Sequence, residues 1–80
     1  MKNFKYELHP VTGAGSVLTM DREIGLKEMQ EFVGGYIEIV PRGEHFFVVN
    51  EEGLLKNLPA NPHFPEFVGN VIRTKRSNLK

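Results

Sequence analysis

The stretch that decides the fold runs from residue 25 to residue 50 and reads GLKEMQEFVGGYIEIVPRGEHFFVVN. Its first part is typical of an amphipathic helix, because apolar residues recur on one face and charged residues occupy the other. Gly25 can act as the N-cap, and Gly34 stands where the end of a helix commonly needs a left-handed residue. We therefore predict a helix over residues 26–33. Its apolar face consists of Leu26, Met29, Phe32 and Val33.

Two strands follow this helix at the spacing of a β-hairpin. In residues 36–40 (YIEIV) the isoleucines fall on one face, with Tyr36 and Glu38 on the other, and the sequence PRG at residues 41–43 ends the strand. The second strand covers residues 44–50 (EHFFVVN). We predict that the two strands pair with each other.

The remaining strands lie toward the two ends of the chain. Residues 4–9 alternate between apolar and polar side chains, which predicts a half-buried strand that ends at Pro10. Residues 16–24 form either a second strand or a lead-in to the helix. Residues 67–75 (FVGNVIRTK) predict a last strand, in which Gly69 marks a bulge or a close approach. The sequence therefore predicts an α+β fold, with one main helix packed on a mostly antiparallel sheet of four to five strands.

The segment before the last strand is predicted to cover the sheet. Leu54, Leu55 and Leu58 offer apolar contacts in a short helical turn or irregular cover, and residues 59–65 form a loop. The phenylalanines at positions 64 and 67 either anchor a partner or close the core.

Composition describes one small soluble domain. The chain has 80 residues, of which 40% are hydrophobic and 25% are charged, with ten basic residues, ten acidic residues and no cysteine. We place the domain at residues 1–72 and a basic C-terminal tail at residues 73–80. Without cysteine there is no disulfide framework and no thiolate metal site, which suits a reducing cytoplasm. No apolar stretch approaches the roughly 20 residues that span a bilayer, and the N-terminus lacks the apolar segment of a secretory signal. We expect a cytoplasmic protein with no membrane partner.

Three blocks of sequence carry a family resemblance. They are VGGYIEIV at residues 33–40, VVNEEGLLKNLPANP at residues 48–62 and FVGNVI at residues 67–72. With these blocks the chain resembles the domain-of-unknown-function family 3846, whose members occur in bacteriophage, plasmid and host genomes. The resemblance covers residues 26–72 and departs at the loop PHFPE, residues 62–66. It implies a mobile-element setting and brings no established enzyme activity.

No group of residues has the spacing of a catalytic or metal site. The serines and threonines lack the context of a nucleophile elbow. Glu51 and Glu52 are adjacent, so on a strand they would point to opposite faces. The three histidines lack the spacing of zinc ligands, and GAGS at residues 13–16 lacks the glycine spacing and the lysine of a phosphate loop. We predict a non-enzymatic protein with no metal and no cofactor.

The uneven distribution of charge predicts either solvated faces with a solubilising tail or an acidic face for a basic partner. Residues 28–52 carry six carboxylates and one base, whereas the last eight residues carry bases and no acid. Those terminal bases are Arg73, Lys75, Arg76 and Lys80. Our leading hypothesis is that the protein binds a host or phage macromolecule, for example a component of a bacterial defence system that it inhibits. The proposed partner-binding residues are Glu28, Glu31, Glu38, Glu51 and Glu52.

A second hypothesis is a small-ligand binder, for example a protein that sequesters a nucleotide. Small-ligand pockets have volumes of roughly 300 to 1,000 Å³, which a monomer of this length can hardly enclose. We therefore expect such a pocket to be formed by a homodimer or a larger assembly. The candidate ligand-binding residues are Gly34, Gly35, Tyr36, Asn50, Arg73, Lys75 and Arg76. Four terminal bases neutralise few phosphates, so nucleic acid is not the expected partner. A third possibility is a structural domain whose partner covers an exposed sheet edge.

Overall fold

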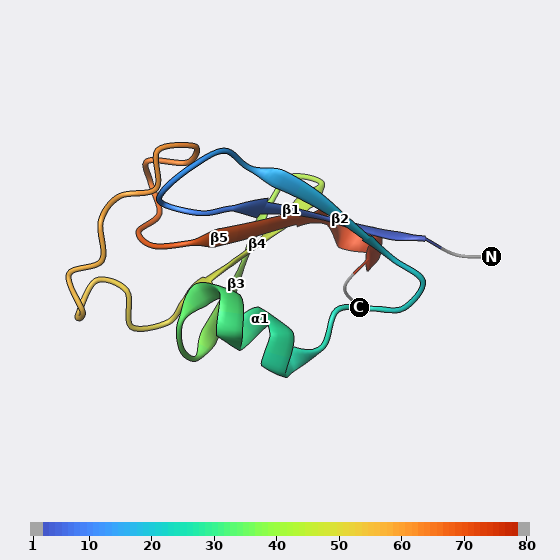
Figure 1. Cartoon of the computed structure of the whole chain (residues 1–80), viewed down its shortest axis with the longest axis horizontal. Coiled ribbons are helices and arrows are strands. Elements are labelled where there is room, and N and C mark those ends of the chain that lie inside the picture. Colours follow the sequence, from blue (N-terminus) through green and yellow to red (C-terminus); the bar gives the residue numbers. More distant parts are fainter. Residues whose placement is uncertain (1–2, 79–80) are drawn as a thin grey trace.

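One helix packs on a five-stranded antiparallel sheet (Figure 1), which confirms the predicted α+β fold. This computed structural model describes residues 3–78. The elements in chain order are β1 (Phe4–His9), β2 (Ser16–Met20), α1 (Leu26–Val33), β3 (Ile37–Arg42), β4 (His45–Asn50), β5 (Val71–Lys75) and a short 3-10 helix (Arg76–Asn78). Of residues 16–24, the first five form a strand, and residues 21–24 lead into the helix. In the described part of the chain, no helix has the length and apolar character needed to cross a membrane.

The helix begins and ends at the two glycines that the sequence predicts. Gly25 is the N-cap, and its backbone N–H donates to Glu28 Oε1 at 2.8 Å. At the other end Gly34 has a φ of 86°, a left-handed conformation that a residue without Cβ adopts at little cost. The N–H of Gly34 donates to the carbonyl of Gln30 at 2.8 Å, so the last turn closes on itself.

The central strand of the sheet comes from the end of the chain. The strand order is β2-β1-β5-β4-β3, so β5 lies between the N-terminal strand pair and the β3–β4 hairpin, and each neighbouring pair is antiparallel. The domain boundary that we place after residue 72 falls inside β5, because Arg73 and Lys75 belong to this strand. Lys80, the last base of the proposed tail, lies outside the described residues.

Two apolar clusters stabilise the sheet, one on each face. The cluster beneath α1 consists of Tyr6, Ile24, Met29, Val33, Val48 and Ile72. The cluster on the opposite face consists of Phe47, Val49, Phe67 and Val71, with Phe64 packed against it. Because side chains on a strand alternate between faces, β4 and β5 contribute to both clusters. Leu26, which we predict on the packed face of the helix, is 57% exposed.

The β3–β4 hairpin is longer than predicted. β3 continues through Pro41 and Arg42, which pair with Phe46 and His45 of β4. The turn then falls at residues 43 and 44, where Gly43 has a φ of 59°. Since β3 is an edge strand, a proline can stand there without removing a hydrogen bond between strands. The predicted end of this strand before residue 41 is therefore wrong.

The last strand was predicted to begin at residue 67, but it begins at Val71. The residues before it form a loop in which Gly69 has a φ of 80° and donates its N–H to the carbonyl of Pro59 at 2.7 Å. A Cβ atom on Gly69 would lie only 2.8 Å from Leu58 Cδ1. The predicted close approach at Gly69 is confirmed, but it occurs in a loop that folds against Leu58.

Leu54 and Leu55 do not provide the predicted apolar contacts. Their exposed fractions are 81% and 84%, and they stand on a turn over residues 51–57. Of the three leucines in this segment only Leu58 packs inward. The structure therefore presents two large apolar side chains to solvent beside the end of β4.

Candidate functional site

Side chains on the sheet face opposite α1 form rows across the strands. One row consists of Val17, Glu7, Arg73, Phe47 and Val40, each opposite the next in the neighbouring strand. In the adjacent row Lys75 stands opposite His45, and His45 stands opposite Arg42. Neighbouring strands are about 4.8 Å apart, so side chains in one row are close neighbours. This face therefore brings together charged side chains from distant parts of the sequence.

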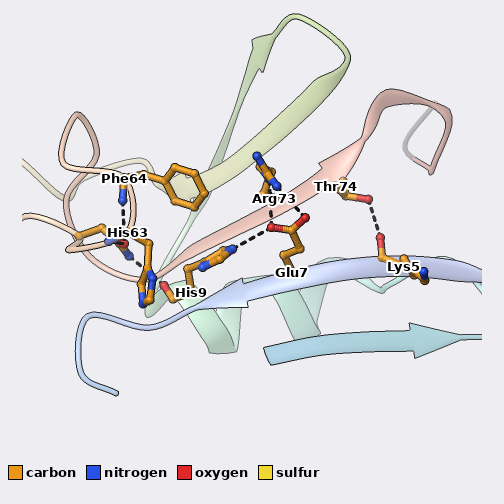
Figure 2. A network of polar contacts seen from close by, with 8 residues as sticks. Lys5, Glu7, His9, His63, Phe64, Arg73 and Thr74 are labelled. Atoms are coloured by element: carbon orange, nitrogen blue, oxygen red, sulfur yellow. Dashed lines mark hydrogen bonds and ion pairs between the residues drawn. The ribbon is translucent and has the colours of Figure 1, made fainter. Parts of the chain in front are cut away.

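A network of polar contacts centres on Glu7 (Figure 2). Arg73 Nε donates to Glu7 Oε1 at 3.0 Å, and Arg73 Nη2 donates to Oε2 at 2.8 Å. His9 Nε2 lies 3.0 Å from Oε1 of the same carboxylate, which can only accept the hydrogen bond. The hydrogen bond from Arg73 lowers the pKa of Glu7, and the one from His9 lowers it further, although burial acts in the opposite direction. Glu7 is therefore an ionised group that is already engaged by two partners.

His9 also contacts His63, which comes from the loop before β5. Their ring centroids are 4.9 Å apart, and the ring of Phe64 packs edge-on against His9 at 4.7 Å. His9 Nδ1 is buried and has no hydrogen-bond partner among the described residues, and a Cβ atom on Gly15 would lie 2.9 Å from it. Within residues 3–78 no group of three His, Cys, Asp or Glu side chains could hold a metal ion. The contact between the rings of His9 and His63 therefore packs the loop against β1.

Asn61, which was not among the residues predicted from the sequence, connects this loop to the sheet. Its side chain is fully buried. Asn61 Nδ2 donates to the carbonyls of His9 at 2.8 Å and Gly69 at 2.9 Å, and Oδ1 accepts from the N–H groups of His63 at 2.8 Å and Phe64 at 3.2 Å. One amide thus satisfies four backbone groups. In the sequence, Asn61 stands out only as an asparagine within the loop segment LPANP. That position does not reveal which groups its side chain contacts.

Asn50 has a similar structural role at the end of β4. Its Nδ2 donates to the carbonyl of Val33 at 3.0 Å, and its Oδ1 accepts from the N–H of Glu52 at 2.8 Å. A Cβ atom on Gly35 would lie 3.1 Å from Asn50 Nδ2 and 3.3 Å from Lys56 Nζ. The turn after the helix is therefore packed by its own side chains, and the Asn50 amide is engaged in holding it.

A hollow of about 460 Å³ lies over β1, β2 and β5, and we call it the basic hollow. Its lining includes Lys5, Glu7, Val17, His45, Arg73 and Lys75. Three of these side chains carry positive charge and one is a carboxylate. Two of the predicted ligand-binding residues, Arg73 and Lys75, therefore come together here, and Lys5 and His45 are additions that the sequence did not indicate. A single chain forms this hollow, whereas we expected a cavity of this size only in an assembly.

A second hollow of about 310 Å³ lies over β3 and the segment after β4, and we call it the acidic hollow. Its lining includes Glu38, Arg42, Glu51, Leu54, Glu66 and Phe67. The guanidinium carbon of Arg42 lies 5.7 Å from the ring centroid of Phe67. The structure therefore brings the predicted residues Glu38 and Glu51 to one place, and it adds Glu66, which was not predicted from the sequence.

The other predicted partner-binding carboxylates have different surroundings. Glu31 is exposed on α1, which covers the opposite face of the sheet. Glu52 Oε1 lies 3.7 Å from the Nζ atom of Lys56, four residues further along the chain. Glu28 belongs to α1 as well and is engaged at its first turn. The five predicted carboxylates thus do not form one continuous site.

The predicted ligand-binding residues are also divided between places. Gly34 and Gly35 follow the end of α1, whereas Asn50 ends β4 and lines the acidic hollow, so none of them lines the basic hollow. Tyr36 follows them and is 67% exposed. Arg76 donates to the carbonyl of Gly43 at 3.3 Å, and its guanidinium carbon lies 5.1 Å from the ring centroid of Phe46.

Glu28 is held by an arginine and by the N-terminus of the helix. Arg22 Nη1 donates to Glu28 Oε1 at 2.9 Å, and Arg22 Nη2 donates to Oε2 at 3.0 Å. These bonds, together with the N–H of Gly25, lower the pKa of Glu28 to about 2. Its carboxylate therefore favours the folded state while it remains ionised.

We expect the contribution of Glu28 to stability to disappear in acid. A carboxyl group whose pKa falls on folding stabilises the folded protein above its ordinary pKa of 4.5, and loses that effect as the pH falls to about 2. The Glu28→Gln variant keeps the shape and an acceptor for Gly25 but loses the charge. It should unfold at lower urea concentration than the original protein near neutral pH, and the difference should shrink in acid. A difference independent of pH would contradict this account.

A family model described as "Domain of unknown function (DUF3846)" matches residues 11–78. Because the match covers most of the chain, the protein belongs to this family, as the resemblance in the sequence implied. No curated protein and no solved structure matches the chain significantly.

Proposed function

We propose that this member of the DUF3846 family is a non-enzymatic binding protein that captures a protein partner through the acidic hollow and the two leucines beside it. The observation that carries the proposal is the exposure of Leu54 and Leu55, at 81% and 84%. Large apolar side chains that protrude together beside a hollow are typical of surfaces that another protein covers.

The backbone that presents these leucines is ordered by its own hydrogen bonds. The N–H of Lys56 donates to the carbonyl of Glu52 at 2.9 Å, and the N–H of Leu58 donates to the carbonyl of Gly53 at 3.0 Å. A Cβ atom on Gly53 would lie 2.7 Å from Val68 Cγ2, so the turn packs tightly on the next loop. A fixed turn loses little conformational entropy when a partner binds, which favours affinity.

Charge indicates the chemistry of the partner. Glu38, Glu51 and Glu66 line the acidic hollow together with one cation, Arg42, and Leu54 forms part of the same lining. A partner with basic side chains around an apolar contact would match this surface in both charge and polarity.

The setting of the proposal comes from the family resemblance. A member of a family found in bacteriophage and plasmid genomes meets host proteins that act against mobile elements. Defence nucleases and other proteins with basic grooves have the chemistry that the acidic hollow fits. In this proposal the protein is a phage or mobile-element accessory protein that occupies such a groove and inhibits a bacterial defence system.

The test compares variants of the full chain as bait in lysate of a bacterial host, followed by affinity measurement on the captured protein. A Leu54→Ser/Leu55→Ser variant should bind that protein at least about tenfold more weakly, because the central apolar contact is lost. Glu51→Lys should slow association. The matched control is Glu31→Lys, a charge reversal on the helix at the other face, which should leave affinity unchanged.

The proposal fails if the captured protein binds the Leu54→Ser/Leu55→Ser variant and Glu51→Lys as tightly as the original chain. Both changes lie at exposed side chains, so unfolding in urea should show unaltered stability. For the defence step, the original chain should restore plating of a restricted phage, and the leucine variant should not.

A further inference from the structure

The basic hollow is independent of the proposed protein-binding surface. It lies over β1, β2 and β5, and it shares no lining residue with the acidic hollow. Both hollows open on the sheet face that α1 leaves uncovered. One face therefore carries two sites of opposite charge.

We propose that the basic hollow binds a small phosphate-bearing anion. Lys5, Arg73 and Lys75 bring positive charge to its lining, against the single carboxylate of Glu7. Arg73 donates two hydrogen bonds to that carboxylate and His9 contacts it as well, so Glu7 is engaged within the network. Because Glu7 and Arg73 are paired with each other, Lys75 adds positive charge to the lining that this pair does not neutralise.

The kinds of donor present suit a phosphate group. The two-pronged guanidinium of an arginine matches carboxylate and phosphate alike, and here Glu7 already occupies the Nε and Nη2 groups of Arg73. A phosphate carries more charge and three acceptor oxygens, so it suits several separate point donors such as ammonium groups. Lys75 and its cross-strand neighbour His45 provide such donors on adjacent strands, with Lys5 in the same hollow.

The strands that carry these donors are fixed to each other. Thr74 Oγ1 donates to the backbone carbonyl of Lys5 at 2.9 Å, which joins β5 to β1 beside the hollow. The Glu7–Arg73 pair joins the same two strands, and the guanidinium carbon of Arg73 lies 5.5 Å from the ring centroid of Phe64. Because paired strands hold the backbone of these residues in place, the site does not have to order that backbone when a ligand binds.

Size and polarity define the ligand further. The volume of about 460 Å³ falls within the range of small-molecule sites, roughly 300 to 1,000 Å³. Val17, which is 62% exposed, lines the same hollow and offers an apolar contact for the part of the ligand without phosphate. A phosphate ester of nucleotide size matches both features.

The first test is calorimetric titration of the full chain with ATP, inorganic pyrophosphate and adenosine. ATP and pyrophosphate should bind and adenosine should not, and a rise in salt from about 50 to about 200 mM should weaken binding several-fold. Equal affinities for ATP and pyrophosphate would show that the phosphates alone account for binding. Tighter binding of ATP would show that contact with Val17 adds to the affinity. Both results support the site. Absence of binding by ATP and pyrophosphate would overturn it.

Variants locate the site. Lys75→Glu should weaken ATP binding at least about tenfold, because a like charge then faces the phosphates, and Lys5→Glu should do the same. Lys27→Glu, on the exposed side of α1, is the matched control and should leave the affinity unchanged. Urea unfolding of each variant separates loss of binding from loss of fold.

Two results would contradict a small-ligand site at this position. One is that both Lys75→Glu and Lys5→Glu bind ATP as tightly as the original chain. The other is affinity for single-stranded DNA that exceeds that for ATP and grows with strand length, which would indicate an extended polyanion surface. ATP binding should persist in the Leu54→Ser/Leu55→Ser variant, so this proposal and the protein-binding function fail or succeed separately.

Discussion

Replacing Asn61 with alanine is expected to destabilise the protein by about 3 to 5 kcal/mol, because four backbone groups lose their partner at once. Two of these groups, the carbonyls of His9 and Gly69, accept from Asn61 in a fully buried position. Each buried polar group left without a partner costs about 1 to 3 kcal/mol, and water entry recovers part of that. A domain of 80 residues has a total stability of about 4 to 12 kcal/mol, so this one change removes a large share.

Urea unfolding followed by circular dichroism measures the effect of Asn61→Ala. Asn3→Ala, at an exposed asparagine, is the matched control and should stay within about 0.5 kcal/mol of the original chain. Asn61→Asp keeps the two acceptor contacts but places a carboxylate oxygen against the carbonyls of His9 and Gly69. It should be at least as unstable as Asn61→Ala near neutral pH. If Asn61→Ala unfolds like the control, the loop does not depend on this amide.

The same amide decides how the loop covers the sheet. Asn61 fixes the backbone at His63 and Phe64, and these side chains then contact the ring of His9. Phe64 in turn lies beneath the guanidinium of Arg73. The arrangement of the polar network around Glu7 therefore depends on a buried asparagine in a loop as well as on the register of β1 and β5.

Local sequence patterns predicted the elements whose causes are local. The helix over residues 26–33 was predicted correctly, because its start at Gly25 and its left-handed end at Gly34 depend on neighbouring residues alone. The first strand was predicted correctly, because alternation of apolar and polar side chains is also a local property. Pro41 misled the prediction for the opposite reason. Whether a proline ends a strand depends on whether that strand lies at the edge of the sheet, and only the topology shows this.

The features that define the two hollows depend on long-range contacts. Lys5 and Lys75 come from opposite ends of the chain, and they line one hollow only because β5 inserts beside β1. Glu66 joins Glu38 in the acidic hollow for a similar reason. Composition identified acidic and basic stretches, but it could not show that Glu28 is engaged at the helix terminus while Glu38 and Glu51 line a surface.

Tyr6 shows how a locally predicted residue acquires a role that its pattern does not indicate, and Tyr6→Ala should destabilise the protein by about 3 to 5 kcal/mol. The alternation in β1 predicts that Tyr6 is on the buried side, and it is fully buried in the cluster beneath α1. Its hydroxyl oxygen also accepts from the N–H of Ile24 at 3.0 Å, just before the helix begins. The ring therefore packs the core while the hydroxyl holds the connection into the helix.

A second variant separates these two roles. Tyr6→Phe keeps the ring and removes only the acceptor, so the N–H of Ile24, itself 8% exposed, loses its partner. We expect a loss of about 1 to 3 kcal/mol from thermal and urea unfolding. The matched control, Tyr36→Phe, removes a hydroxyl from a 67% exposed ring and should change stability by less than about 0.5 kcal/mol. Should Tyr6→Phe behave like this control, packing of the ring alone explains the need for an aromatic residue in β1, and the helix start relies on Gly25 and Glu28 without help from the core.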